Sequence, residues 1–166
     1  MTRHEARECA LQALCVLDVQ RDLGSAEAIA SALAERGTDA GGDFTYIEEL
    51  VDGTRRHLDE IDELLARHME RWSPERIGRV ERNVLRLATY ELLFEPELPI
   101  ASAIDEAVEI AKTFATEQSG RFVNGVLAKL LPAVAERRRA DTREAGQEKR
   151  TASAAEPARE GVDDGA

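Results

Sequence analysis

The 166-residue sequence has no apolar run approaching the roughly 18 to 20 residues that a helix needs to cross a membrane. It also has no apolar region of a secretory signal near its N-terminus, because Glu5 and Glu8 interrupt that stretch. These two absences predict a protein without a membrane span, and we expect a cytoplasmic location.

Cysteine and aromatic residues are also scarce. Cys9 and Cys15 lie six residues apart in one helical pattern, so they point to different faces. We expect both to be small core residues rather than a disulfide or half of a metal site. Aromatic residues make up only 4% of the chain, so the core is expected to be mainly Leu, Val, Ile and Ala.

Sequence patterns for catalysis or metal binding are missing. Gly41 and Gly42 are followed by no Lys-Ser/Thr pair and preceded by no strand, so they do not form a phosphate-binding loop. His4, His57 and His68 form no H-E-x-x-H pattern and no close pair with cysteine. We therefore predict no metal, no cofactor and no enzymatic activity.

Basic residues are in the minority. The chain has 22 Lys and Arg against 33 Asp and Glu, a formal net charge of −11. Residues 133–166 hold seven basic and eight acidic residues, which leaves 15 basic and 25 acidic residues in 1–132. An acidic body excludes a large basic nucleic-acid surface, so any such contact must be local or helped by a partner.

The spacing of apolar residues predicts helices over most of the chain. Apolar residues recur every three to four positions, and no segment keeps the two-residue period of a strand. Ser25 is expected to cap the second helix, and Thr45 with Glu48 to form a capping box on the third. The predicted helices cover 3–21, 26–36, 44–70, 75–94, 100–115 and about 119–135.

The segment WSPERI precedes the fourth predicted helix. Ser73 is expected as its N-cap and Pro74 as its first helical residue. Trp72 and Ile77 stand at the two positions of a hydrophobic staple, so we interpret the single Trp as a structural clamp.

Residues 136–166 have a different composition. This segment contains one Val and no larger apolar residue, so it cannot bury enough surface to offset its ordering entropy. We predict a disordered polar tail, with Arg137, Arg138 and Arg139 at a solvated helix end.

Phe122 stands apart from the other apolar residues of the last predicted helix. With Phe122 at the origin of a wheel of about 100° per residue, Val123, Val126, Leu127 and Leu130 define a buried face centred on about 90°. On the other side of Phe122 lie Arg121, Gly125, Lys129 and Gln118. A ring beside cations, an amide and bare backbone suits single-stranded RNA. Spacing alone leaves open, and favours, packing of Phe122 on a neighbouring helix, with Gly125 permitting close helix contact.

Four separated blocks of the sequence resemble the bacterial transcription antitermination factor family NusB. They are RECALQAL (7–14), VERNVLRLATYEL (80–92), PIASAIDEAVEIAKTF (99–114) and SGRFVNGVLAKL (119–130). The resemblance covers about residues 3–132. It implies an all-α fold of about seven helices in two packed three-helix subdomains, with subbundles at about 1–72 and 73–135.

The resemblance also implies a non-enzymatic function in transcription. Proteins of this family bind the boxA RNA in the leader of ribosomal RNA transcripts, together with the ribosomal protein NusE. Their complex joins RNA polymerase with NusA and NusG to suppress termination and supports ribosomal RNA synthesis and maturation. These partners are our expectation for this chain, and a homodimer is also possible.

The family's RNA surface combines an N-terminal basic stretch with the start of the last helix. By this resemblance the RNA-binding residues are expected to be Arg3, His4, Arg7, Gln118, Arg121 and Phe122, joined by Gly125 and Lys129 from the helical wheel. We expect the two groups to lie side by side. The helix with VERNVLRLATYEL is implied to bind NusE, through Glu81 and, with less support, Arg82.

The sequence departs from the family at several of these positions. Glu5 stands inside the basic stretch, Cys15 replaces a residue that is often aromatic, and Gln118 stands where a carboxylate is common. A helical protein–protein interaction module with little intrinsic RNA binding is therefore the alternative. A NusB-like domain fused to an RNA cytosine methyltransferase is a third, which we do not expect because the chain ends in a polar tail.

Overall fold

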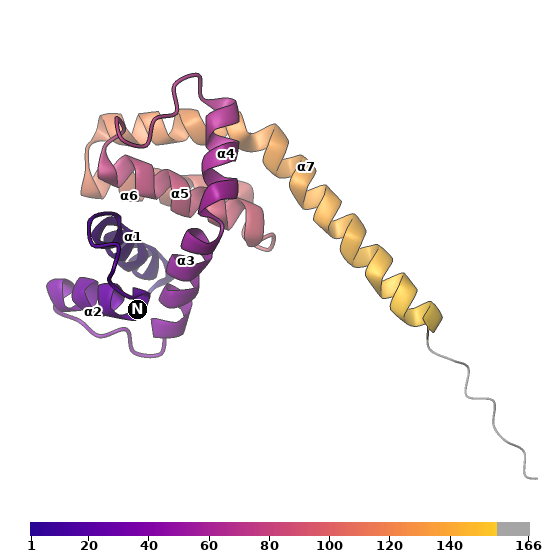
Figure 1. The fold of residues 1–166 in the computed structure, drawn as a ribbon, viewed down its shortest axis with the longest axis horizontal. Helices are drawn as coiled ribbons and strands as arrows, with labels where there is room; N and C mark the ends of the chain where they lie inside the picture. The colour runs from indigo at the N-terminus through magenta and orange to yellow at the C-terminus, as the bar shows by residue number, and fades with distance from the viewer. Residues whose placement is uncertain (156–166) are drawn as a thin grey trace, which may run out of the picture.

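The computed structural model describes residues 1–155, and within them the chain is all helical, with no strand (Figure 1). This confirms the predicted fold class. The seven helices are α1 (Arg3–Val19), α2 (Ser25–Arg36), α3 (Phe44–Arg56), α4 (Leu58–His68), α5 (Arg79–Phe94), α6 (Ile100–Phe114) and α7 (Glu117–Ala155).

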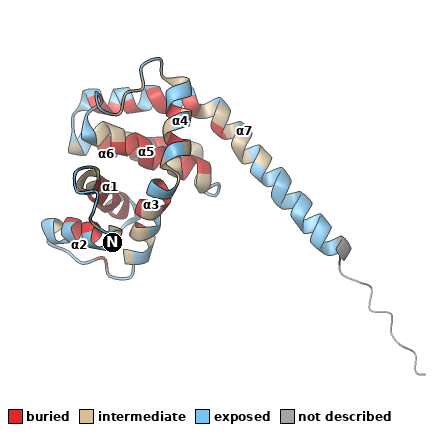
Figure 2. Cartoon of the chain, viewed as in Figure 1, coloured by how far each residue is buried: buried red, intermediate tan, exposed pale blue. Residues whose placement is uncertain are grey.

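The helices pack in two groups around one aliphatic core. α1, α2 and α3 pack on each other, and so do α5, α6 and α7. α1 and α3 also contact α5, while α4 packs mainly on α5 and α7. Buried residues occur in all these helices (red in Figure 2). Each fully buried Leu or Ile stabilises the fold by about 1.5–3 kcal/mol. A division into subbundles at about residue 72 stays a prediction.

Capping differs from the prediction at both sites. The predicted capping box of Thr45 and Glu48 is wrong, because α3 begins at Phe44 and has no side-chain cap. The capping box lies instead on α1, where Thr2 Oγ1 accepts from the Glu5 amide at 3.0 Å and Glu5 accepts from the Thr2 amide at 2.9 Å. Glu5 therefore stabilises the start of α1.

Ser25 is the first residue of α2 rather than its cap. Gly24 occupies the N-cap position, and the Ser25 hydroxyl donates to Asp52 Oδ1 at 2.5 Å. A tertiary hydrogen bond to α3 has thus replaced the local one that the sequence predicted.

The single helix predicted over 44–70 is two helices that change direction at His57. The His57 ring stacks on Phe94 of α5, with 4.0 Å between ring centroids. α3 packs on α1, α2 and α5, whereas α4 packs on α5 and α7. Periodicity alone does not reveal the break, because apolar spacing is the same on both sides of it.

The fourth predicted helix begins at Arg79, four residues later than expected. Ser73 and Pro74 instead start a turn, in which the Ser73 carbonyl accepts from the Arg76 and Ile77 amides at 2.9 and 3.2 Å. The half-buried Trp72 packs against the core, as a structural clamp would.

The prediction of a disordered tail from residue 136 needs correction over 136–155, where α7 continues as helix. Arg137 pairs with Glu60 of α4, and Arg138 donates to the Leu92 carbonyl at 2.9 Å and the Leu98 carbonyl at 2.8 Å. These two arginines are therefore anchors on the body rather than a solvated end. Further on, α7 projects away from the body and is exposed (Figures 1 and 2). The predicted tail over 156–166 lies outside the described residues.

Three further observations concern the described residues. Cys9 is buried and Cys15 half-buried, and both are free thiols, as predicted. Over residues 1–155, no helix is long and apolar enough to cross a bilayer. The same residues contain no cluster of three His, Cys, Asp or Glu side chains suited to a metal ion.

Candidate nucleic-acid interface

The start of α7 is fixed on α5 by a short chain of polar contacts. Thr116 Oγ1 accepts from the Ser119 amide at 3.0 Å, which caps the helix, and the Ser119 hydroxyl donates to Glu81 Oε1 at 2.6 Å. The face predicted to be buried is buried: Val123, Val126, Leu127 and Leu130 are at most 4% exposed. The opposite side of this part of α7 therefore faces solvent.

Phe122 lies at the edge of this buried face and keeps 36% of its surface exposed, one of few large apolar residues to do so among those described. It borders a hollow of about 410 Å³ together with Arg121, Gly125 and Lys129. We call these four residues the Phe122 surface. The structure thus brings together four of the predicted RNA-binding residues, and Gln118 is exposed one turn earlier on the same helix.

Gly125 is not needed for helix packing. A β-carbon placed on it would meet nothing within 4 Å, so the position is open to solvent. The interpretation of Gly125 as a close helix contact is therefore wrong. What the glycine leaves is exposed backbone beside an aromatic ring.

The far wall of the hollow comes from the connection between α4 and α5. Met69, Glu70, Arg71 and Ile77 line it, opposite the Phe122 surface. Within residues 1–155, no ion pair involves Arg71, Arg121 or Lys129. Three free cations around an exposed ring outweigh the one carboxylate, Glu70. Helical periodicity did not find this wall, because a tertiary contact brings the connection to α7.

Arg82 holds that connection in place. Its guanidinium donates to Asp18 Oδ2 at 2.8 and 3.0 Å, to the Ile77 carbonyl at 3.2 Å and to the Pro74 carbonyl. The predicted partner-binding residue Arg82 thus spends its donors inside the molecule. Glu81, the other one, is half-buried and accepts from Ser119.

The predicted N-terminal half of the site, on α1, makes contacts within the molecule. Arg7 is 7% exposed, and its Nε donates to both carboxylate oxygens of Glu91 at 3.1 Å. His4 Nδ1 lies 2.5 Å from Glu106 Oε2. The guanidinium of Arg3, which is exposed, lies over the Tyr46 ring, 3.7 Å from its centroid.

The expectation that the two halves lie side by side stays a prediction. The start of α7 contacts α5 at Glu81, and Arg7 contacts it at Glu91, about 15 Å further along α5 at 1.5 Å per residue. α1 runs antiparallel to α5, since Asp18 near the other end of α1 contacts Arg82. The proposal below therefore rests on the Phe122 surface alone.

Glu91 is a buried carboxylate of α5 that was not predicted as a notable residue from the sequence. It is 3% exposed, and burial raises the pKa of its carboxyl to about 7 despite the opposing charge of Arg7. One signal was present: Val84, Leu87 and Glu91 share a helical stripe that is otherwise apolar. A carboxylate on a buried stripe requires a buried partner.

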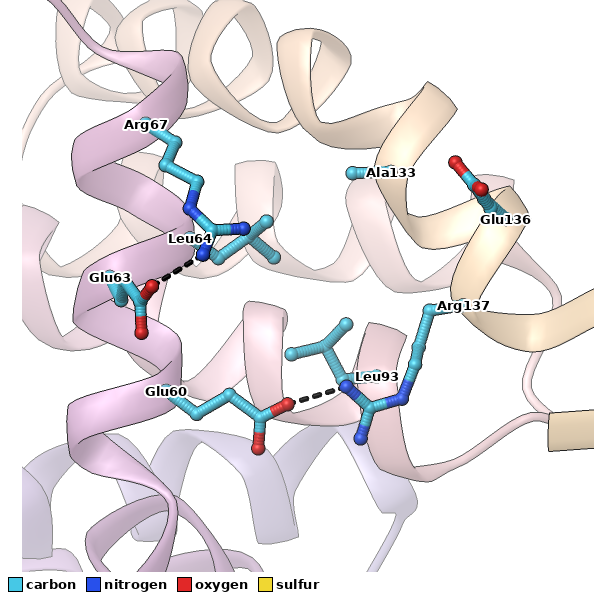
Figure 3. A pocket seen from close by; sticks show the side chains of 8 residues that line it. All are labelled: Glu60, Glu63, Leu64, Arg67, Leu93, Ala133, Glu136 and Arg137. Carbon is cyan, nitrogen blue, oxygen red and sulfur yellow. Dashed lines mark hydrogen bonds and ion pairs between the residues drawn. The ribbon is translucent and has the colours of Figure 1, made fainter. Parts of the chain in front are cut away.

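A second hollow, of about 380 Å³, lies between α4, α5 and α7 (Figure 3). Its floor is apolar, from Leu64, Leu93 and Ala133. Around the rim, Arg67 pairs with Glu63 and Arg137 with Glu60, so these charges satisfy each other. The Arg137–Glu60 pair holds α7 on α4, and this hollow offers little free charge to a ligand.

A model of the NusB family matches residues 4–132. The chain is 45% identical over 135 residues to a transcription antitermination protein NusB of Geobacillus kaustophilus (strain HTA426), covering 81% of this chain and 98% of that protein.

Two solved structures share the fold. One is NusB of T. maritima, with a TM-score of 0.69, 41% identity and coverage of 78% of this chain and 90% of that one. The other is a crystal structure of the antitermination factors NusB and NusE in complex with dsRNA, with a TM-score of 0.69, 33% identity and coverage of 80% and 99%.

Proposed function

Because the chain belongs to the NusB family, we propose that it is a transcription antitermination factor that binds RNA together with NusE. We propose boxA RNA of ribosomal RNA leader transcripts as the ligand, and support of ribosomal RNA transcription and maturation as the outcome. The observation that carries this proposal is the Phe122 surface, an exposed ring beside two unpaired cations and a bare glycine backbone.

The chemistry of this surface suits an unpaired strand. A base stacks on the Phe122 ring, while Arg121 and Lys129 neutralise the phosphates on either side of it. Gly125 lets the sugar–phosphate backbone approach α7, because no side chain stands in the way. Few cations take part, so binding by the chain alone is expected to be weak.

NusE supplies the rest of the binding free energy in this proposal. The acidic body, with a net charge of −11, favours a basic partner that adds its own contacts to the same RNA. Glu81 is our candidate NusE contact, because it lies at the start of α5 and holds Ser119 beside the Phe122 surface. We further propose that the complex joins RNA polymerase with NusA and NusG.

The alternative function is a helical protein–protein module with little RNA binding of its own. It is favoured by one observation: His4 and Arg7, the expected N-terminal RNA ligands, already contact Glu106 and Glu91. In that case NusE binding would persist without any measurable RNA affinity.

A titration of boxA RNA separates the two functions. Fluorescence anisotropy would follow the labelled RNA with the chain alone and with its own NusE, at two salt concentrations. For the chain alone we expect a salt slope of about −2, from the three cations Arg71, Arg121 and Lys129 on a single strand. Binding should strengthen when NusE is added.

Phe122→Leu is the decisive variant, because leucine keeps the apolar packing and removes the ring. Loss of one stacked base should weaken RNA binding by about 5- to 150-fold, the equivalent of about 1–3 kcal/mol. Val19→Leu, a change at an exposed apolar residue of α1 that does not line the hollow, is the matched control and should bind as the wild type does. Equal RNA affinity of Phe122→Leu and wild type would refute the proposed site, and no RNA binding even with NusE would favour the alternative.

A further inference from the structure

In the part of α7 beyond the family match, three exposed arginines share one face and three carboxylates lie on the opposite one, where Arg137 pairs with Asp141. On the same wheel of about 100° per residue, Arg139, Arg143 and Arg150 are centred on about 280°. Asp141, Glu144 and Glu148 are centred on about 75°, which continues the buried face of the helix. We call the three arginines the distal stripe.

The distal stripe is aligned with the Phe122 surface. Arg121, Gly125 and Lys129 are centred on about 300° of the wheel, so both sets share one side of α7. The distance from Arg121 to Arg150 is about 44 Å at 1.5 Å per residue. α7 contains Pro132, and Figure 1 shows the helix bending as it leaves the body. Glu136, at about 320° of the wheel, is the acidic residue between the two sets.

The arginines of the distal stripe are available to a ligand. All three are exposed, and within the described residues none forms a side-chain hydrogen bond or an ion pair. Arg137 and Arg138, by contrast, are held by the body. Arg137 and Arg138 thus anchor the extension on the body, whereas the arginines of the distal stripe are free.

The charge pattern serves the stability of the helix only in part. Arg137 and Asp141 form a favourable pair at i and i+4, 3.4 Å apart. Arg139 with Arg143 and Glu144 with Glu148 are like-charged pairs at the same spacing, which destabilise an isolated helix. Arginines gathered on one face and carboxylates on the other instead suit a charged partner that binds along one side of the helix.

We propose that the distal stripe holds the phosphate backbone of the same RNA strand after it leaves the Phe122 surface, an inference that rests on the proposed function. A polyanion fits better than an acidic protein, because residues 139–153 carry no apolar side chain larger than Ala. Protein interfaces depend on larger apolar or aromatic anchors, whereas phosphate contacts need only cations.

Two RNA lengths test this inference in the full-length chain. One RNA is limited to boxA, and the other carries about ten additional unpaired nucleotides, added in separate molecules at the 5′ or the 3′ end. The test variant is Arg139→Gln with Arg143→Gln and Arg150→Gln, since glutamine keeps similar helix propensity. The matched control on the opposite face is Asp141→Asn with Glu144→Gln and Glu148→Gln.

We expect the arginine variant to bind one of the long RNAs at least about ten-fold more weakly at about 0.1 M salt, with a salt slope smaller by about 2. Its affinity for the short RNA should stay at the wild-type value, and the acidic-face control should not weaken either RNA. Circular dichroism should show unchanged helix content in both variants.

Wild-type affinity and salt slope of the arginine variant on both long RNAs would overturn the inference. An equal loss on short and long RNA would also overturn it, because a general charge effect would then suffice. The proposed function fails separately: Phe122→Leu without effect on the short RNA refutes the Phe122 site, whatever the arginine variant does on the long one.

Discussion

Replacing Glu91 by glutamine tests how the buried Arg7–Glu91 pair contributes to stability. Glu91 is 3% exposed, and burial raises its pKa from 4.5 to about 7, although Arg7 donates to both carboxylate oxygens at 3.1 Å. The folded protein therefore binds this proton more tightly than the unfolded chain does. The stabilisation is fully present below about pH 4.5 and is lost as the pH rises through about 7.

The size of the effect follows from the same pKa. A rise from 4.5 to about 7 corresponds to about 3 kcal/mol of unfolding free energy lost between acidic and mildly alkaline pH. For a chain of this length that is about 6–12 °C in Tm. The pKa of Glu95 is also raised by burial, so it adds in the same direction.

Thermal and urea unfolding of wild type and Glu91→Gln at pH 5, 6, 7 and 8 would measure this. The wild type should lose stability across the range, and Glu91→Gln should lose much less. Arg7→Met is the control that should change the pH dependence the other way. Removal of the cation raises the pKa of Glu91 further, so this variant should lose more stability than the wild type as the pH rises, and the loss should extend to higher pH. Parallel curves for wild type and Glu91→Gln would refute the reasoning.

Two further substitutions have defined outcomes. Gly125→Ala should stabilise α7 by up to about 1 kcal/mol, because the added β-carbon meets nothing within 4 Å, yet it should weaken RNA binding if the RNA backbone approaches there. Thermal unfolding and RNA anisotropy check both parts, and unchanged affinity would contradict backbone approach. Arg82→Ala should cost about 2 kcal/mol in urea unfolding, less than a fully buried pair would, because Arg82 and Asp18 remain partly exposed. A loss under about 0.5 kcal/mol would show that the connection between α4 and α5 does not depend on Arg82.

Local patterns in the sequence determined the helical class, the aliphatic core and the orientation of the last helix. The wheel around Phe122 was reliable because neighbours within one helix are related by fixed geometry alone. It therefore placed Arg121, Phe122, Gly125 and Lys129 on one side before any fold was known, and the structure confirms that they share one surface.

Only the tertiary structure decided which charged residues are free. Arg7 and Arg121 look alike in the sequence, yet Arg7 is buried against Glu91 and Arg121 faces a hollow. The difference arises because α1 runs antiparallel to α5, which puts Arg7 beside a carboxylate 84 residues away in the chain. Helix periodicity carries no information about such long-range partners, so burial, pairing and exposure of these charges follow from packing.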